Sequence, residues 1–403
     1  MPEIVNRAVR AQMAGASWIR RMFETGIELK QRLGPDKVFD FSLGNPDVPA
    51  PALAAEALRV LAERATRPCA LGYVPNAGIP SFRSRLAARL RTEQAVPLEA
   101  RHVLATCGAA GALTAFFRAV LEPGDEVVCP APYFVEYGAY CGHFGGVLRP
   151  VPARLPAFEP DVEAIGAAIG PRTRVLLINS PNNPTGAVYG PDALQALSGL
   201  LARANAGRER PVFLVADEPY RFLTYDGATV PPVLPLSPFA VVAGSFSKSL
   251  SLAGKRVGYL AVNPAMPEAQ VLLDAVTMTV RTLGFVNAPV LGQALAEALL
   301  DTGVDLAVYD RRRRAMADAL ARAGIAFHLP RGAFYFFPAA PGGDDAAFVQ
   351  RLLAENILAV PGRGFGFPGH FRLTFCVDER TIAAAAPGFA RAAAAARTPG
   401  SAS

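Results

Sequence analysis

Short apolar segments alternate with segments of helical length along the first two thirds of the chain, and this alternation constrains the fold more than any other feature. The strand-like runs lie at 126–129, 147–151, 174–179, 212–216 and 239–243. The helix-like runs lie at 52–64, 80–91, 109–121, 161–169 and 191–204. Strands separated by helix-length segments are typical of βαβ units. The pattern therefore predicts an α/β fold with a mostly parallel sheet.

One pair of strand-like runs departs from this rule. Only about a dozen residues separate the run 239–243 from the run 257–262, which is barely enough for the crossover that parallel strands require. We therefore expect these two strands to be antiparallel neighbours in a mixed sheet.

The pattern changes near residue 298, where a smaller unit is expected. It comprises an arginine-rich helix at 305–323, a helix at 346–355, a strand at 372–375 and a last helix in the alanine-rich tail. This mixture predicts a small α+β unit. The four consecutive arginines Arg311–Arg314 spread over all faces of one helical turn, so we expect a solvated helix surface there.

The composition of the 403 residues excludes several classes of protein. Hydrophobic residues make up 51% and charged residues 18% of the chain, which excludes extended disorder. The net charge of +6 is small for this length, so no nucleic-acid interface is expected. The five cysteines and four histidines lack the spacing of a metal site, so no bound metal is expected.

The N-terminal segment has scattered charges and no long apolar core. No stretch reaches about 18 uncharged apolar residues, the length that a membrane-spanning helix requires. We therefore expect neither a secretory signal nor a membrane-spanning helix, and a cytoplasmic protein.

Few side chains offer a primary amine, because lysine occurs only at Lys30, Lys37, Lys248 and Lys255. Lys30 and Lys37 lie in a polar helix and its exit, and Lys255 stands next to an arginine. Solvated ammonium groups are expected at these three positions. Lys248 follows an apolar strand, and it is the amine that we expect in a pocket. Burial there disfavours the charged form, and a neutral amine can attack a carbonyl.

Polar residues follow two of the predicted strands. Asp217 ends the strand 212–216, where a carboxylate either pairs with a cationic group of a ligand or caps the next helix. Asn183 lies in the turn SPNNPTG after the strand 174–179, and turn chemistry alone could explain it. The segment TCGAAGAL (106–113) leads into an apolar helix, and its small residues would let a phosphate approach backbone N–H groups.

Together these segments resemble the class I/II aminotransferases, pyridoxal-phosphate enzymes of fold type I that are similar to aspartate aminotransferase. The motifs are SPNNPTG (180–186), ADEPY (216–220), and SFSK (245–248) followed by Arg256. The segments LGNPD (43–47), GYVPNAGIP (72–80) and FRLTF (371–375) match the family in the same order. The resemblance implies a large domain over 48–297 that contains the mixed sheet, and a small α+β domain formed by 1–47 and 298–403.

The resemblance also implies roles for residues around the cofactor. Lys248 would form a Schiff base with pyridoxal 5′-phosphate and then move the substrate proton. Asp217 would pair with the ring nitrogen, and Tyr220 and Asn183 would bind the phenolate oxygen. Phe134 stands where the family stacks an aromatic ring on the cofactor.

Other residues would hold the cofactor phosphate and the substrate. The phosphate site would comprise Gly108, Ala109, Ala110, Ser245 and Arg256. Tyr73 matches a tyrosine that family members lend to the partner subunit, which implies a homodimer with shared sites. Arg372 would bind the substrate α-carboxylate through a bidentate contact, and Gly44 and Asn183 would line the same pocket.

The resemblance implies an aminotransferase that exchanges an amino group between an amino acid and a 2-oxo acid. The same cofactor residues would also serve a β-lyase, a decarboxylase or an oxidase, and the motifs do not separate these reactions. A non-enzymatic regulator on this fold would carry an extra DNA-binding domain, and only a short segment precedes LGNPD. We therefore expect an enzyme that acts on amino acids, without nucleic-acid or membrane partners.

Overall fold

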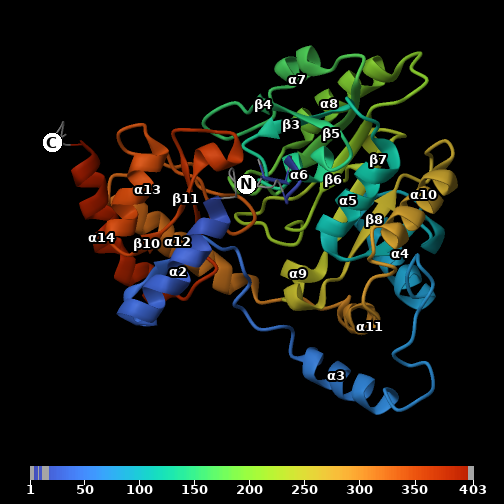
Figure 1. Cartoon of the computed structure of the whole chain (residues 1–403), viewed down its shortest axis with the longest axis horizontal. Coiled ribbons are helices and arrows are strands. Elements are labelled where there is room, and N and C mark those ends of the chain that lie inside the picture. Colours follow the sequence, from blue (N-terminus) through green and yellow to red (C-terminus); the bar gives the residue numbers. More distant parts are fainter. Residues whose placement is uncertain (1–3, 8, 11–17, 398–403) are drawn as a thin grey trace.

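A computed structural model describes residues 4–7, 9–10 and 18–397. Its larger unit is built on a seven-stranded sheet with the strand order β2-β8-β7-β6-β5-β3-β4 (Figure 1). The strands are β2 (Val103–Thr106), β3 (Glu126–Ala131), β4 (Val147–Pro152), β5 (Thr173–Asn179), β6 (Phe213–Asp217), β7 (Ala240–Ser245) and β8 (Gly258–Val262). Neighbouring strands are parallel except β8, which is antiparallel to β7 and β2. The predicted mixed sheet and its antiparallel pair are thus confirmed.

Helices cover both faces of this sheet, because strand side chains alternate between the two faces. The helices on one face are α4 (Pro80–Gln94), α7 (Val162–Ala168), α8 (Pro191–Asn205) and α11 (Val290–Leu299). The helices on the other face are α5 (Gly108–Val120), α6 (Tyr137–Gly142) and α10 (Ala269–Thr282). Within β5, Leu176 and Ile178 share a core with the first group, and Val175 and Leu177 share a core with the second. Helix α3 (Leu53–Arg64) contacts α11.

Sequence reasoning missed several elements of the larger unit, among them β2, α10, α11 and the six-residue helix α6. Strand β2 has four residues, too few to show the period of two that identifies a strand. Helix α10 contains a run of valine and threonine residues, AVTMTV, whose β-branched side chains favour strands. Helix α11 contains Gly292, which weakens a helical pattern.

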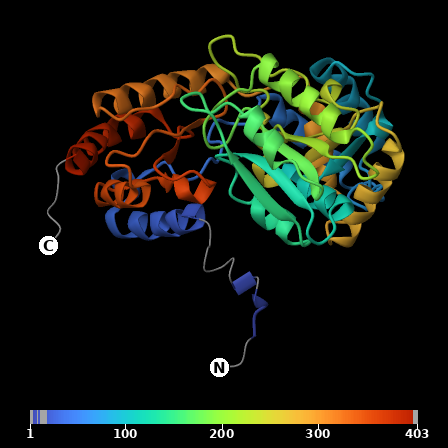
Figure 2. The same cartoon turned by 90° about the horizontal axis from the view of Figure 1, so that it is seen from above.

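The smaller unit combines a segment near the N-terminus, which begins with α2, and the C-terminal part of the chain (Figure 2). Its helices are α2 (Trp18–Leu33), α12 (Leu306–Arg322), α13 (Asp345–Ala354) and α14 (Glu379–Arg397). Strand β12 (Phe371–Thr374) pairs antiparallel with β9 (Tyr335–Phe336) and β11 (Val360–Pro361). Strand β1 (Phe39–Asp40) pairs in parallel with β10 (Ile357–Leu358), so backbone hydrogen bonds tie the N-terminal segment to the C-terminal unit. These elements share a second hydrophobic core.

The prediction of a solvated surface at Arg311–Arg314 is wrong for two of the four arginines. Arg312 is buried and its Nη1 lies 2.6 Å from a carboxylate oxygen of Asp47. Arg313 is 1% exposed and pairs with Asp226 at 2.7 Å and Asp310 at 2.8 Å. The two arginines therefore anchor α12 to Asp47 and Asp226, partners that sequence spacing did not reveal.

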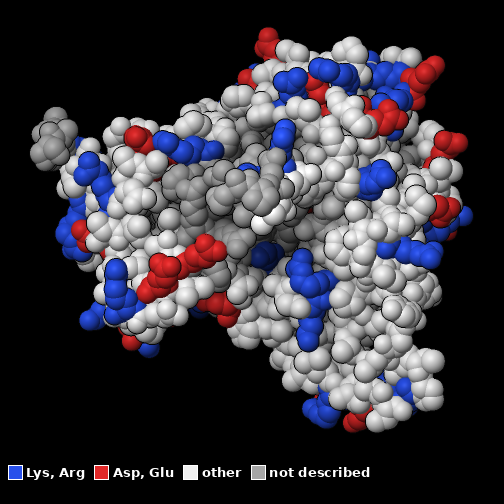
Figure 3. Space-filling model, in the orientation of Figure 1, with Lys and Arg blue, Asp and Glu red and all other residues white. Residues whose placement is uncertain are grey.

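Short connecting elements complete the fold. The 3₁₀ helices are Pro35–Lys37, Ala100–His102, Leu234–Leu236, Ala253–Lys255 and Gly362–Phe365, and one short α-helix, α9, spans Phe246–Ser249. Within the described ranges, no helix combines the length and the apolar character needed to cross a membrane. The space-filling view shows basic and acidic side chains interspersed on one face and a hollow between the two units (Figure 3).

Candidate active site

A cavity of about 330 Å³ lies where the carboxyl ends of β5, β6 and β7 face the smaller unit. The large unit contributes Ala109, Ala110, Leu113, Phe134, Glu136, Tyr140, Asn179, Asn183, Asp217, Pro219, Tyr220, Ser245, Ser247, Lys248, Ala253 and Arg256. The N-terminal segment contributes Leu43 and Gly44, and the smaller unit contributes Tyr335 and Arg372. The carboxyl ends of parallel strands are the usual ligand-binding edge of an α/β sheet.

Lys248 reaches the cavity because α9 begins directly after β7. Ser245 caps this helix by accepting a hydrogen bond from the Ser247 backbone N–H at 3.1 Å. Lys248 Nζ donates to the Gly44 carbonyl at 2.6 Å and lies 5.5 Å from the centre of the Phe334 ring. Burial lowers the pKa of Lys248 to about 8, and the positive charges of Arg372 and Arg256 act in the same direction. About one tenth of this amine is therefore neutral near pH 7, far more than for an ordinary lysine.

The other three lysines lie outside the cavity. Lys37 and Lys255 are exposed. Lys30 forms an ion pair with Asp40 at 2.9 Å. Among the described lysines, Lys248 is thus the one that lies in the cavity.

Asp217 presents one free oxygen to the cavity. Its Oδ2 accepts a hydrogen bond from the Tyr137 hydroxyl at 2.6 Å, and its buried Oδ1 has no partner among the described residues. Burial raises the pKa of Asp217 to about 6, although the Tyr137 hydrogen bond opposes the rise. No helix begins after Asp217, so the alternative of a helix cap is excluded. A buried carboxylate oxygen without a partner is costly unless a cationic group of a ligand meets it.

Two asparagines hold the turn that follows β5. Asn179 Nδ2 donates to the Asp217 carbonyl at 2.7 Å, and Asn179 Oδ1 accepts from the Asn183 backbone N–H at 2.7 Å. Asn183 Oδ1 in turn accepts from Arg372 Nη1 at 3.0 Å. This chain of hydrogen bonds connects the end of β6 to the smaller unit.

Arg372 is a buried cation without an acidic partner. Its guanidinium donates to the Ser42 carbonyl and to Asn183, and its Nε has no partner. The guanidinium lies 4.8 Å from the centre of the Tyr335 ring and 4.9 Å from that of Phe365. No carboxylate of the described chain lies within 4 Å of it. Burial lowers the pKa of Arg372, and an anionic ligand would offset the cost of burying this charge.

The first turn of α5 places backbone N–H groups next to the guanidinium of Arg256. Gly108 begins this helix with φ +74°, a conformation that favours glycine, and a Cβ there would lie 3.0 Å from Arg256 Nη2. The missing side chain lets the guanidinium lie against the helix start, where it donates to the Cys107 carbonyl at 3.4 Å. The first N–H groups of a helix lack partners within the helix and attract anions. Ser245 lines the same cavity.

A pair of tyrosines closes the side of the cavity near Gly44. The hydroxyl oxygens of Tyr220 and Tyr335 are 2.9 Å apart. A Cβ on Gly44 would lie 2.0 Å from Tyr335 Oη. Only glycine at this position therefore allows the segment to pack so closely on Tyr335 while offering its carbonyl to Lys248.

The structure brings together most residues singled out from the sequence. The cavity is lined by Gly44, Ala109, Ala110, Phe134, Asn183, Asp217, Tyr220, Ser245, Lys248, Arg256 and Arg372. Gly108 lies beside them, next to Arg256. Phe134 packs edge-on against Tyr137, with ring centres 5.5 Å apart. Tyr73 does not join them: it is 90% exposed and lies outside the cavity of its own chain.

Sequence reasoning missed several residues of the site. They are Leu43, Glu136, Tyr137, Tyr140, Asn179 and Tyr335. The tyrosines stand among aromatic and apolar residues and read as core positions, so no local signal distinguishes them. Asn179 precedes the SPNNPTG turn, and its place at a strand end was the one signal that could have found it.

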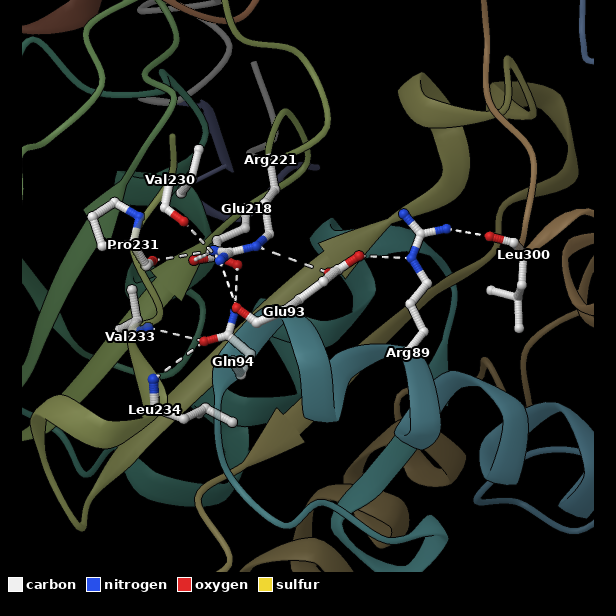
Figure 4. Close-up of polar contacts among 10 residues, drawn as sticks. All are labelled: Arg89, Glu93, Gln94, Glu218, Arg221, Val230, Pro231, Val233, Leu234 and Leu300. Atoms are coloured by element: carbon white, nitrogen blue, oxygen red, sulfur yellow. Dashed lines mark hydrogen bonds and ion pairs between the residues drawn. The ribbon is translucent and has the colours of Figure 1, made fainter. Parts of the chain in front are cut away.

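A buried ion pair supports the chain directly after Asp217 (Figure 4). Glu218 accepts hydrogen bonds from Arg221 Nη1 at 3.0 Å and from Gln94 Nε2 of α4 at 2.9 Å. Arg221 Nη2 donates to the backbone carbonyls of Glu93 at 2.7 Å and Val230 at 2.8 Å. Burial raises the pKa of Glu218 to about 7, and the charge of Arg221 opposes the rise. The network fixes the segment that carries Asp217 to α4.

Comparisons with known proteins show which family the chain belongs to. The family model "Aminotransferase class I and II" matches residues 36–388. The chain is 34% identical over 381 residues to a probable aspartate/prephenate aminotransferase of Thermus aquaticus, covering 91% of this chain and 94% of the relative. It is 31% identical over 348 residues to an aspartate aminotransferase of Thermotoga maritima, covering 85% of this chain and 88% of the relative.

Solved structures give the same result. An aminotransferase from Eubacterium rectale superposes with a TM-score of 0.93 at 35% identity, covering 98% of this chain and 100% of that one. The aspartate aminotransferase of Thermus thermophilus, solved with maleate, gives 0.86 at 29% identity, covering 97% and 100%. The predicted family and fold are confirmed: the chain belongs to the class I and II aminotransferases, pyridoxal-phosphate-dependent enzymes of fold type I.

Proposed function

We propose that this aminotransferase uses Lys248 to carry pyridoxal 5′-phosphate while an amino group passes between an amino acid and a 2-oxo acid. The observation that carries the proposal is the shared cavity. It contains an amine whose pKa is lowered to about 8 and a buried carboxylate whose Oδ1 has no partner. An amine-reactive cofactor with a cationic ring nitrogen fits both groups.

The remaining residues fit the same cofactor. When bound, pyridoxal phosphate supplies an aldehyde for the amine and a ring that withdraws electrons from the substrate Cα. Asp217 Oδ1 would accept from the ring nitrogen, and Tyr220 and Asn183 would donate to the ring oxygen. Phe134 would pack on the ring face. The backbone N–H groups of Gly108, Ala109 and Ala110, together with Ser245 and Arg256, would hold the phosphate.

Lys248 has a second task, which is to move the proton at the substrate Cα. At pH 7 an amine with a pKa of about 8 is about one tenth neutral, whereas an ordinary lysine is almost wholly charged. The hydrogen bond to the Gly44 carbonyl at 2.6 Å supports this role because it holds Nζ in one place.

Arg372 would bind the substrate α-carboxylate. It is buried without an acidic partner, and Asn183 holds one of its terminal nitrogens at 3.0 Å. A fixed guanidinium is suited to a carboxylate because two parallel N–H donors match its two oxygens. Gly44 lies beside this site.

We also propose a cytoplasmic homodimer in which Tyr73 completes the partner's phosphate site. The high exposure of Tyr73 outside its own cavity supports the shared site. The five cysteines are all free thiols, which supports the cytoplasmic location. Mixing Tyr73→Ala and Lys248→Ala subunits tests it. A mixed dimer with shared sites contains one intact site, so random mixing should restore about a quarter of the wild-type activity. No recovery would rule out the shared site.

The reaction itself is tested by the absorbance of the holoenzyme as amino acids are added. Conversion of the cofactor to its amine form, reversed by pyruvate or 2-oxoglutarate, is expected. Release of ammonia or carbon dioxide in stoichiometric amounts would instead favour a lyase or a decarboxylase, and consumption of oxygen would favour an oxidase.

A further inference from the structure

Leu43 lies between two residues whose backbone carbonyls are hydrogen-bonded to cations of the cavity. The carbonyl of Ser42 accepts a hydrogen bond from Arg372, and the carbonyl of Gly44 accepts one from Lys248 at 2.6 Å. A substrate with its carboxylate at Arg372 and its amino group at Lys248 therefore brings its Cα next to residue 43. Leu43 lines this cavity with 40% of its surface exposed, and an exposed apolar side chain inside a pocket is a surface for a ligand.

Each cation of the described cavity lining already has a role in the proposed function. Among the described residues that line it, the cations are Lys248, Arg256 and Arg372. Arg256 lies at the proposed phosphate site and Arg372 at the proposed α-carboxylate site, and Lys248 would hold the cofactor carbon with which the substrate amino group reacts. No lysine or arginine of this lining remains for a second carboxylate on the substrate.

An acidic residue adds repulsion. Glu136 lines the cavity just before α6, and no lysine or arginine in the described ranges lies within 4 Å of its carboxylate. The rest of the lining includes the apolar residues Leu113, Pro219 and Ala253. A second substrate carboxylate would face this charge with no uncommitted cation in the described lining to pair with it, which costs binding free energy.

We propose that this enzyme prefers substrates with an uncharged, apolar side chain, which packs on Leu43, over the dicarboxylic substrates for which three of the similar proteins above are named. The inference rests on the function proposed above, because that function places the α-carboxylate and the amino group.

The test measures binding of two unreactive probes to the holoenzyme, by calorimetry and by the shift of the cofactor absorbance. 4-Methylpentanoate carries an apolar side chain and one carboxylate, and maleate carries two carboxylates. We expect 4-methylpentanoate to bind at least about tenfold more tightly than maleate. Equal or tighter binding of maleate would overturn the proposal.

Two variants assign the preference to named residues. Leu43→Ala should weaken 4-methylpentanoate binding about tenfold and leave maleate binding unchanged. Glu136→Gln should strengthen maleate binding about two- to fivefold. The matched control is Leu306→Ala, because Leu306 is also 40% exposed but lies at the start of α12, outside the cavity. If Leu43→Ala leaves the binding of both probes unchanged, the proposal is wrong.

Amino-acid donors separate this inference from the proposed function. Faster conversion of the cofactor by leucine than by aspartate supports both. Faster conversion by aspartate contradicts the side-chain preference and leaves transamination standing. If no amino acid converts the cofactor, the proposed function is wrong, and the proposed side-chain preference is then wrong as well.

Discussion

The Tyr137 hydroxyl donates a 2.6 Å hydrogen bond to Oδ2 of Asp217, while Oδ1 of the same carboxylate has no partner in the part of the chain that the structure describes. The tyrosine therefore orients the carboxylate and leaves one oxygen unpaired, where we propose that the cofactor ring nitrogen binds. Both groups are buried, so the arrangement depends on tertiary packing between α6 and β6.

Removing this hydrogen bond should weaken catalysis without removing the cofactor. Tyr137→Phe takes away a group that favours ionised Asp217, so the pKa of Asp217 should rise further above its ordinary value. We expect kcat to fall about 10- to 100-fold, since hydrogen bonds to charged groups contribute about 1.5–3 kcal/mol. Steady-state kinetics measure this fall in kcat. The matched control is Tyr189→Phe, because Tyr189 is also a buried tyrosine but lies outside the cavity. An unchanged kcat would show that Tyr137 does not orient the carboxylate.

The raised pKa of Asp217 also predicts how the stability of the apoprotein depends on pH. Because the folded pKa of about 6 lies above the ordinary value of 3.8, the folded state binds more protons than the unfolded state between these values. The contribution to stability is present below about pH 4 and is lost as the pH rises through about 6. Urea unfolding should show this loss in the wild type and less of it in Asp217→Asn. If the free energy of unfolding depends on pH in the same way in both proteins, the pKa of Asp217 is not raised.

Adding one methyl group at Gly44 should disrupt the site. In Gly44→Ala the new Cβ would lie 2.0 Å from Tyr335 Oη, so the backbone or Tyr335 must move. A shift of about 1 Å at reacting groups can cost about 100-fold in rate, and we expect a loss of that size in kcat. Gly170→Ala is the matched control, because a Cβ there meets nothing within 4 Å. Full activity of Gly44→Ala would mean that the close packing has no function.

The buried pair behind Asp217 should matter for stability. Glu218→Ala leaves Arg221 with the more distant Glu93 carboxylate at 3.9 Å, and the loss of one partner of a buried ion pair typically costs about 3–5 kcal/mol in the free energy of unfolding. Glu218→Gln keeps hydrogen-bonding atoms for Arg221 and Gln94, so its cost should be clearly smaller. Urea unfolding of the holoenzyme measures both variants. Equal costs would show that the charge at position 218 contributes nothing beyond the packing.

The strands and the motif residues could be predicted because their signals are local. Buried parallel strands such as 174–179 and 212–216 read as continuous apolar runs, and Lys248, Asp217 and Asn183 follow such runs directly. Their joint presence at one edge follows from the parallel topology.

The features that could not be predicted depend on contacts between segments that are distant in the sequence. Nothing near Tyr335 in the sequence shows that it meets Gly44, and nothing near Arg312 shows that it pairs with Asp47. A run of arginines reads as solvated until its acidic partners are placed in space. Residues that act through tertiary contact, such as Tyr137, therefore look like ordinary core residues in the sequence.

The central claim is that Lys248 alone among the lysines carries the cofactor. Its lowered pKa predicts that the rate of covalent attachment to the apoprotein rises with pH and levels off above about 8. An ordinary lysine would show a rate that keeps rising to a pH above 10.

The most direct measurement is peptide mapping by mass spectrometry after borohydride reduction of the holoenzyme. The account predicts one reduced adduct, on the peptide that contains Lys248, and no adduct in Lys248→Ala. An adduct on Lys30, Lys37 or Lys255, or one that persists in Lys248→Ala, would contradict it.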